Sequence, residues 1–131
     1  MACGSGTNTL AYSIDGLRWT GLGTTVFSTQ ANWAEWNGSR WVAVGSGTNS
    51  IAYSIDGMIW TGSTSGNSIF TSVNDIAWNG TRWVAVGQGI NSIAYSADGI
   101  TWTAVSTTVF STQGNGVAWT GSLWEIGRAH V

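Results

Sequence analysis

Proline and lysine are absent from the 131-residue chain, cysteine and histidine occur once each, and only 8% of the residues are charged. The formal net charge is −2, whereas proteins that bind nucleic acid or anionic membranes electrostatically carry an excess of positive charge. We therefore expect neither as a partner. Cys3 is the single cysteine and cannot form an intrachain disulfide. No apolar run approaches the roughly 20 residues of a membrane-spanning helix. These absences exclude disulfide scaffolds, helical membrane proteins and electrostatic binders of nucleic acid.

Glycine and tryptophan are abundant, with nineteen and ten residues. The segments AYSIDGLRW, AYSIDGMIW and AYSADGITW place Asp15, Asp56 and Asp98 at separations of 41 and 42 residues. The tryptophans that follow the same register are Trp19, Trp36, Trp41, Trp60, Trp78, Trp83, Trp102, Trp119 and Trp124. The chain therefore consists of three copies of one unit of 41 to 42 residues.

Each unit is predicted to contain four short antiparallel strands and no helix. In the unit around Asp98 the expected strands are Ile76–Trp78, Arg82–Gly87, Ser92–Ser96 and Ile100–Thr103. The first two are joined by Asn79-Gly80, a strong hairpin signal because both central residues of such a turn favour positive φ. The high content of Gly, Ser, Thr and β-branched residues disfavours helix.

The predicted strands are apolar on both faces. In RWVAVG, Val84 and Val86 share one face, whereas Trp83 and Ala85 share the other. A sheet with one face in water would alternate polar and apolar residues, so both faces should be covered, as in stacked repeats. Four-stranded meanders of this length, stacked around an axis, are the blades of a β-propeller. We therefore expect an all-β propeller fragment, with the recurring tryptophans packed between blades.

The pattern Ser-x-Asp-Gly-x-x-Trp in the three segments resembles the Asp-box of the sialidase-type (BNR-like) propellers, with one residue fewer between Asp and Gly. The resemblance covers all three units and implies that the motif forms the turn between the third and fourth strands of a blade. It implies no single function, because the motif occurs in glycosidases, lectin-like modules, assembly factors and surface proteins alike.

The polar residues of this motif are predicted to have a structural role. The aspartate can accept backbone N–H bonds within the turn, and the glycine can adopt positive φ. These turn residues are Asp15, Gly16, Asp56, Gly57, Asp98 and Gly99. A metal site is the alternative, but it needs several converging oxygen ligands, whereas each turn carries one carboxylate. We therefore expect no metal and no cofactor.

The residue inventory does not support an enzyme. A sialidase-like site, which the resemblance would imply, needs an arginine cluster, a tyrosine nucleophile with a glutamate, and an aspartate acid/base. Here the arginines are scattered and the tyrosines are repeat residues. The carboxylates outside the turns are Glu35, Asp75 and Glu125, which do not supply the pair that a glycosidase needs. The only histidine, His130, lies in the last seven residues.

Residues that break the repeat are better candidates for function. Glu35 stands where the other units have Ala77 and Ala118, and Trp33 is an additional aromatic residue beside it. This pair can contact a sugar, although drift at an exposed strand end is the alternative. We expect a non-catalytic recognition module that binds glycans or cell surfaces, from a microbial or phage protein with an extracellular or virion-surface location. The alternatives are a piece of a larger propeller hydrolase or assembly factor, and a purely structural scaffold.

The last seven residues, EIGRAHV, depart from the repeat and resemble, residue for residue, the translation of a common short-read sequencing adapter. The opening MACGSGTN matches VAVGSGTN from the middle of a second strand. We therefore expect a three-repeat fragment followed by a non-native tail at 125–131. Within 1–124, the expected parts are half blades at 1–21 and 115–124 and whole blades at 33–62 and 75–104.

The two half blades are complementary. Closing them within one chain would give three blades, below the ~4–8 that propellers use. Two chains arranged head to tail would complete each other's half blades. We therefore expect a homodimer with six blades.

Overall fold

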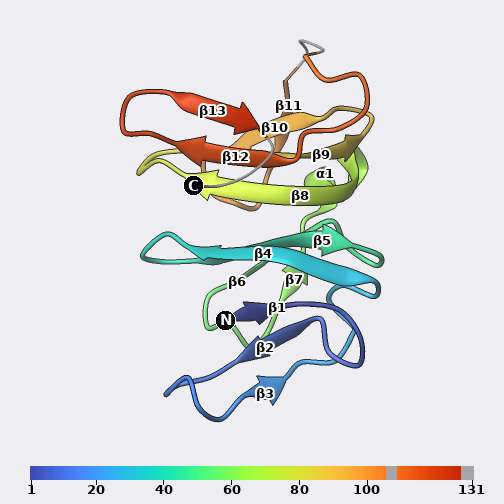
Figure 1. Ribbon diagram of the computed structural model, residues 1–131, viewed down its shortest axis with the longest axis vertical. Coiled ribbons are helices and arrows are strands. Elements are labelled where there is room, and N and C mark those ends of the chain that lie inside the picture. Colours follow the sequence, from blue (N-terminus) through green and yellow to red (C-terminus); the bar gives the residue numbers. More distant parts are fainter. Residues whose placement is uncertain (106–108, 128–131) are drawn as a thin grey trace.

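The computed structural model describes residues 1–105 and 109–127, which form thirteen strands and one short helix. Four units follow one another along the chain and lie in layers along the long axis of the molecule (Figure 1). The first unit contains β1 (Ala2–Cys3), β2 (Leu10–Tyr12) and β3 (Thr20–Gly21), and the fourth contains β12 (Gly116–Trp119) and β13 (Trp124–Gly127). The prediction of an all-β fold is confirmed.

The two middle units each contain four antiparallel strands in meander order. The second unit consists of β4 (Gln30–Trp36), β5 (Trp41–Ser46), β6 (Ile51–Ser54) and β7 (Thr61–Gly62). The third unit consists of β8 (Phe70–Trp78), β9 (Trp83–Gly89), β10 (Ile93–Ser96) and β11 (Thr103–Ala104). Within each of these two units, every strand therefore pairs with the strands next to it in the sequence.

The hairpin between β4 and β5 of the second unit has a different backbone conformation from the expected turn. Asn37 N donates to the Arg40 carbonyl at 3.1 Å, and Asn37 Oδ1 accepts from the backbone N–H groups of Ser39 and Arg40. Gly38 has a φ of 103°, but no described non-glycine residue has positive φ. The expectation of positive φ at both Asn and Gly is therefore wrong. The asparagine closes the loop with its side chain instead.

A short helix, α1 (Thr64–Ile69), separates β7 from β8, although no helix was predicted. Ser63 caps it, because its Oγ accepts from Gly66 N at 3.1 Å. The same Oγ donates to the Ile100 carbonyl in the third unit at 2.6 Å. The sequence of this segment departs from the repeat. Ser63 both caps the helix and connects it to the third unit, which stabilises a helix at this place.

The largest differences from the predicted strand boundaries are the starts of β8 and β11, whereas the other boundaries of the third unit agree within two residues. β8 begins at Phe70 rather than Ile76, because two bulges allow it to continue its pairing with β9. β11 begins at Thr103 rather than Ile100, because the Ile100 N–H bonds to the Asp98 side chain in the preceding turn.

The sheets of the two middle units are joined. Ser46, at the end of β5, pairs with Ser72 in β8, which merges the two meanders into one curled sheet of eight strands. A similar approach links the third and fourth units, where Gly114 N donates to the Gly87 carbonyl at 2.9 Å. The two meanders share one sheet at this junction because the backbones of neighbouring units come within hydrogen-bonding distance.

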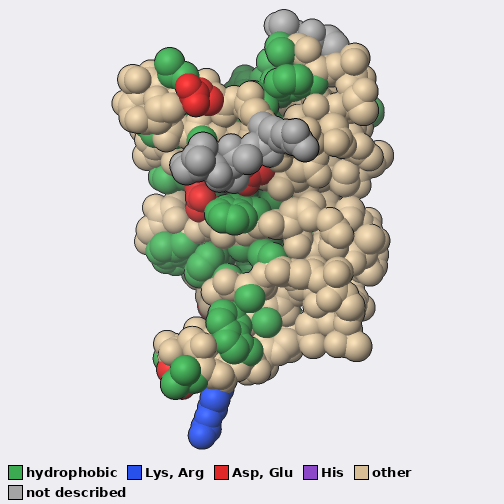
Figure 2. Space-filling model, viewed as in Figure 1, with side chains coloured by type: hydrophobic (Ala, Val, Ile, Leu, Met, Phe, Trp, Pro, Cys, Tyr) green, Lys and Arg blue, Asp and Glu red, His purple; other side chains and the backbone are tan. Residues whose placement is uncertain are grey.

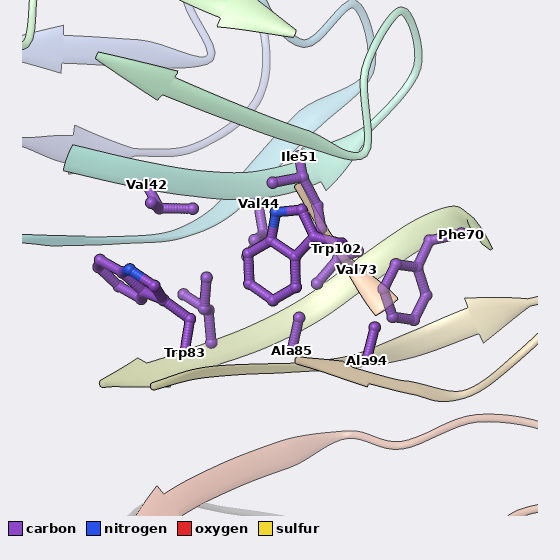
Figure 3. Close-up of a cluster of buried hydrophobic side chains, with 10 residues drawn as sticks. Val42, Val44, Ile51, Phe70, Val73, Trp83, Ala85, Ala94 and Trp102 are labelled. Carbon is purple, nitrogen blue, oxygen red and sulfur yellow. The ribbon is translucent and has the colours of Figure 1, made fainter. Parts of the chain in front are cut away.

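Apolar clusters fill the spaces between consecutive units. We call them the first, second and third cluster, in order along the stack. The second cluster lies between the second and third units (Figure 3). Its buried members are Val42, Val44, Ile51, Phe70, Val73, Ile76, Trp83, Ala85, Ala94 and Trp102.

The other two clusters show the same arrangement. The first cluster is built around Leu10, Phe27 and Ala43, and the third around Val84, Val86 and Val117, among other residues. Both faces of the second strands are therefore buried, because consecutive side chains along β5 or β9 belong to different clusters. The two-sided apolar pattern of the sequence reflects this packing.

The tryptophans differ in burial, although nearly all were expected between units. Trp102 is buried in the second cluster. Trp19 has the same repeat position in the first unit but is 50% exposed. Trp36, at the hairpin end of β4, is also largely exposed. Burial therefore depends on position in the stack as well as on position in the repeat.

The described part of the chain contains no helix that is both long enough and apolar enough to cross a membrane. The only helical segment there, α1, has six residues and connects two strands.

Candidate functional site

The Asp-Gly turns between the third and fourth strands share one set of hydrogen bonds. In the second unit, Asp56 Oδ1 accepts from the backbone N–H groups of Met58 and Ile59 at 2.8 and 3.0 Å. Trp60 Nε1 donates to the Gly57 carbonyl at 3.0 Å, and Gly57 has a φ of 80°. The turn is therefore closed by its own side chain and backbone groups.

The other two turns repeat these contacts. Asp15 and Asp98 each accept from the backbone N–H groups two and three residues later, at 2.8 to 3.0 Å. Gly16 and Gly99 both have a φ of 77°. A serine two residues before each aspartate also donates to it, at 3.0 to 3.1 Å. The carboxylate oxygen that closes each turn is thus occupied by hydrogen bonds within the turn.

These hydrogen bonds lower the pKa of the turn aspartates. For Asp15 and Asp56, the backbone N–H groups three and two residues later stabilise the carboxylate and hold its pKa below the usual value. For Asp98, partial burial raises the pKa. The N–H groups of Thr101 and Ile100 together lower it by more than burial raises it, so the pKa of Asp98 also lies below its usual value. All three carboxylates are therefore stabilised in the ionised form by the folded turn.

Acid should destabilise the protein through these turns. Because folding lowers each pKa, the stabilisation is present above the unfolded carboxyl pKa of about 3.9 and is lost as the pH falls through the folded values. We expect the thermal midpoint to fall as the pH drops below about 4. Thermal melts from pH 7 to pH 2 test this. A variant with Asp98→Asn should lose less stability over this interval, and an equal loss would contradict the assignment to the turns.

Replacing a turn carboxylate should also weaken the fold at neutral pH. Asp98→Ala removes the acceptor for the N–H groups of Ile100 and Thr101, and we expect a loss of about 1 to 2 kcal/mol in the free energy of unfolding. Urea denaturation measures the loss. Asp98→Asn, which keeps an acceptor oxygen, is the matched control and should cost less. A comparable destabilisation of the unaltered chain by a chelator would instead indicate a metal site.

Trp33 and Glu35, the predicted contact pair, lie together on β4. Trp33 Nε1 donates to Glu35 Oε1 at 3.4 Å, and the indole is 42% exposed. The other carboxylate oxygen, Oε2, accepts from Trp78 N in the third unit at 2.8 Å. The pair therefore lies where β4 and β8 adjoin. Hydrophobic side chains gather along one side of the stack, with few charged groups between them (Figure 2).

Asp75 has a related role at the next junction, which the sequence did not reveal. It is buried on β8, and its Oδ2 accepts from Val117 N in the fourth unit at 3.0 Å. Glu35 and Asp75 stand at different positions of the repeat, yet each carboxylate accepts an N–H from the first strand of the next unit. The sequence offered little sign of this shared role. Glu35 and Asp75 are each the one carboxylate in the first strand of their unit, but their positions do not align in the repeat.

Asparagine side chains link the same units through backbone carbonyls. Asn32 Nδ2 donates to the Val73 carbonyl at 2.7 Å, and Asn74 Nδ2 donates to the Gly114 carbonyl at 2.8 Å. Unlike the carboxylates, these asparagines occupy equivalent repeat positions. Side chains on the first strand of one unit thus form hydrogen bonds with backbone N–H and C=O groups of the next unit.

Neither a metal centre nor a reactive thiol is evident. Among residues 1–105 and 109–127, no group of three or more His, Cys, Asp or Glu side chains could hold a metal ion. His130 lies outside the described residues. Burial raises the pKa of the Cys3 thiol to about 11, despite the opposing effect of the nearby N-terminus, so this thiol is protonated at neutral pH.

The predicted tail is partly within the structure. Glu125 and Ile126 belong to β13 and pair with Ala118 and Val117 of β12, and Ile126 packs against the third cluster. Residues 128–131 lie outside the described residues. The first part of this segment therefore takes the place of a second strand, although its sequence departs from the repeat.

Comparisons of the chain with models of known families, with curated proteins and with solved structures gave no match. The resemblance to the Asp-box propellers therefore rests on the residues of the three turns.

Proposed function

We propose that the chain is a non-catalytic recognition module made of propeller-type blades, and that it binds carbohydrate at Trp33 and Glu35. The layered meanders, with apolar clusters between consecutive units, support the propeller part of this proposal. The site rests on one observation: an indole that is 42% exposed lies beside a carboxylate.

This pair has the chemistry that sugar recognition needs. The C–H face of a pyranose packs on an indole ring, and sugar hydroxyls donate hydrogen bonds to a carboxylate. The contact of Glu35 with Trp78 N fixes the carboxylate to the neighbouring strand, so that little side-chain entropy is lost on binding. A ligand that stacks on Trp33 would therefore find its acceptor already in place.

A structural scaffold is the second candidate, and a different contact favours it. Glu35 Oε2 accepts from Trp78 N just as Asp75 Oδ2 accepts from Val117 N. Both carboxylates join the first strands of neighbouring units. If this is their whole role, Trp33 only covers the junction, and the chain binds no sugar there.

A glycan array followed by titration of the best glycan tests the recognition proposal. We expect Trp33→Ala to weaken binding by about tenfold or more, because the stacking surface is lost. The control is Ile59→Ala, which removes an apolar side chain that is even more exposed than Trp33 from an Asp-Gly turn and should leave binding unchanged. Absence of glycan binding, or full binding by the Trp33 variant, would contradict the proposal.

Glu35→Gln separates the two candidates. The amide oxygen of glutamine can still accept from Trp78 N, whereas the charge and the second carboxylate oxygen are lost. Recognition predicts weaker glycan binding with little change in the thermal midpoint. A scaffold role predicts no effect of Glu35→Gln on binding, and a lower midpoint only for Glu35→Ala, which removes the acceptor for Trp78 N.

A further inference from the structure

Two of the hairpins between first and second strands carry the same tripeptide pattern. Asn37-Gly38-Ser39 joins β4 to β5, and Asn79-Gly80-Thr81 joins β8 to β9. Asn-x-Ser/Thr, with any residue except proline in the middle, is the acceptor pattern for N-linked glycosylation. No other asparagine of the chain is followed two residues later by serine or threonine. Both occurrences therefore fall on one position of the repeat.

The carboxamide oxygen of each asparagine closes its hairpin. Asn37 Oδ1 accepts from Ser39 N at 3.0 Å, from Arg40 N at 2.8 Å and from Ser39 Oγ at 3.2 Å. Asn79 Oδ1 has the same three kinds of donor, at 3.0, 2.7 and 3.2 Å. Three donors around one atom identify it as the oxygen of the carboxamide, because the nitrogen only donates. The loop therefore fixes the orientation of both carboxamides.

The carboxamide nitrogen takes no part in closing the hairpin. Within residues 1–105 and 109–127, every hydrogen bond of the Asn37 and Asn79 side chains is made by Oδ1. Oxygen and nitrogen lie on opposite sides of Cγ, so Nδ2 faces away from the donors that surround Oδ1. This nitrogen is the atom to which an N-linked oligosaccharide is attached.

The hairpin of the fourth unit shows that closing the loop requires only an oxygen. Thr120 stands at the position of the two asparagines, and its Oγ1 accepts from Leu123 N at 3.2 Å and from Ser122 N at 3.4 Å. The glycine that follows has a φ of 103° in all three hairpins. A residue without a carboxamide thus forms the same loop, and the group that only the asparagines supply is Nδ2.

The tips of both hairpins have open space around them. Gly38, Ser39, Gly80 and Thr81 are exposed, and a Cβ atom on either glycine would have no atom within 4 Å. The hairpins lie along one side of the stack (Figure 1). A bulky substituent therefore has room at each tip without displacing a described segment.

We propose that Asn37 and Asn79 accept an N-linked oligosaccharide when the chain is made in a secretory compartment. The donor is an oligosaccharide carried on a lipid diphosphate, and an oligosaccharyltransferase catalyses the transfer. Nδ2 forms a bond to the anomeric carbon of the first sugar, and the bond from that carbon to the diphosphate oxygen breaks. Nδ2 loses one proton, the lipid diphosphate leaves, and nothing is oxidised or reduced. These sites do not depend on glycan binding at Trp33 and Glu35.

The folded hairpin can retain its contacts after the modification. Substitution at Nδ2 leaves the carbonyl oxygen unchanged, so Oδ1 keeps all three donors that close the loop. The oligosaccharide is then attached on the side of the carboxamide that faces away from the loop. We therefore expect the glycosylated chain to fold as the unmodified chain does.

Translation of the whole chain behind a cleavable secretion signal, in the presence of microsomal membranes, tests both sites. We expect a product that carries two oligosaccharides. Treatment with peptide N-glycosidase in heavy-oxygen water should remove both and leave labelled aspartate at positions 37 and 79. The label separates enzymatic release from spontaneous deamidation. The readout is the mass of the translated chain, so a variant that folds poorly remains informative.

Variants assign each oligosaccharide to its asparagine. Asn37→Gln and Asn79→Gln should each remove one oligosaccharide, and the double variant should carry none. Ser39→Ala keeps the carboxamide of Asn37 but lacks the hydroxyl of the pattern, and it should lose the same oligosaccharide as Asn37→Gln. Asn115→Gln is the control, because Asn115 also precedes a glycine but has Val117 two residues later. This variant should keep both oligosaccharides.

Two results would overturn the proposal. The first is an unmodified chain from membranes that glycosylate a reference protein, and the second is modification that persists in the double variant. The role of Oδ1 has its own test in thermal melts of the purified glycosylated and unmodified chains. We expect midpoints within about 4 °C of each other. A larger fall on glycosylation would show that Nδ2 takes part in the fold, which would contradict the assignment of loop closure to Oδ1 alone.

Discussion

Replacing Trp83 by alanine should lower the free energy of unfolding by about 3 to 5 kcal/mol. Trp83 is fully buried, and it packs from β9 into the second cluster between the two complete units (Figure 3). Its ring also lies 5.0 Å from that of Trp78 across the hairpin. The substitution leaves a large cavity at the junction that holds the middle of the stack together. Urea denaturation followed by circular dichroism measures the effect.

Two control variants separate packing from other roles of the indole. No described residue accepts a hydrogen bond from Trp83 Nε1, so Trp83→Phe loses volume but no hydrogen bond and should cost only about 1 to 2 kcal/mol. Trp36→Ala removes a tryptophan that is 45% exposed, and we expect a loss of about 1 kcal/mol. Equal losses for Trp36→Ala and Trp83→Ala would show that burial between units is not what stabilises the fold.

A single added methyl group at Gly87 should have the second largest effect, about 3 kcal/mol. A Cβ atom there would clash with the Ser72 carbonyl oxygen and would lie 2.8 Å from Val73 Cα. Both atoms belong to the backbone of β8, which is held by its own pairing and cannot yield as a flexible side chain would. Gly87→Ala therefore forces apart the first two strands of the third unit, and chemical denaturation measures the loss.

Gly4→Ala is the matched control for this prediction. Gly4 has the same repeat position, but a Cβ atom there would have no neighbour within 4 Å. We expect a change of less than about 0.5 kcal/mol for dilute, monomeric protein. If the two substitutions cost the same, the loss at Gly87 would come from the glycine's backbone freedom and not from close packing of the strands.

The repeat predicted the elements well because each unit encodes them locally. Alternating apolar residues, an Asn-Gly hairpin and an Asp-Gly turn are signals that act within a few residues. The helix α1 was missed because its segment departs from the repeat, and its capping serine, Ser63, was not recognised among several serines and threonines. Likewise, no repeat pattern shows that Ser46 pairs with Ser72 in the next unit.

The environment of each residue was harder to predict than its element. Trp19 and Trp102 have nearly the same local sequence, yet one is half-exposed and the other buried, because burial is set by the neighbouring unit. The sequence identified Trp33 and Glu35 as a pair that breaks the repeat. It did not show that Glu35 also binds Trp78 N, because that contact joins residues 43 positions apart.

The stacking of consecutive units is the central claim, and nuclear Overhauser effects across the junctions test it most directly. A Cβ atom at Gly99 would lie 2.7 Å from Val42 Cγ2, and one at Gly57 would lie 3.3 Å from Met1 Sδ. The account predicts cross-peaks from the Gly99 α-protons to a Val42 methyl group, and from the Gly57 α-protons to the Met1 methyl group. Strong cross-peaks within each unit, without either of these, would contradict it.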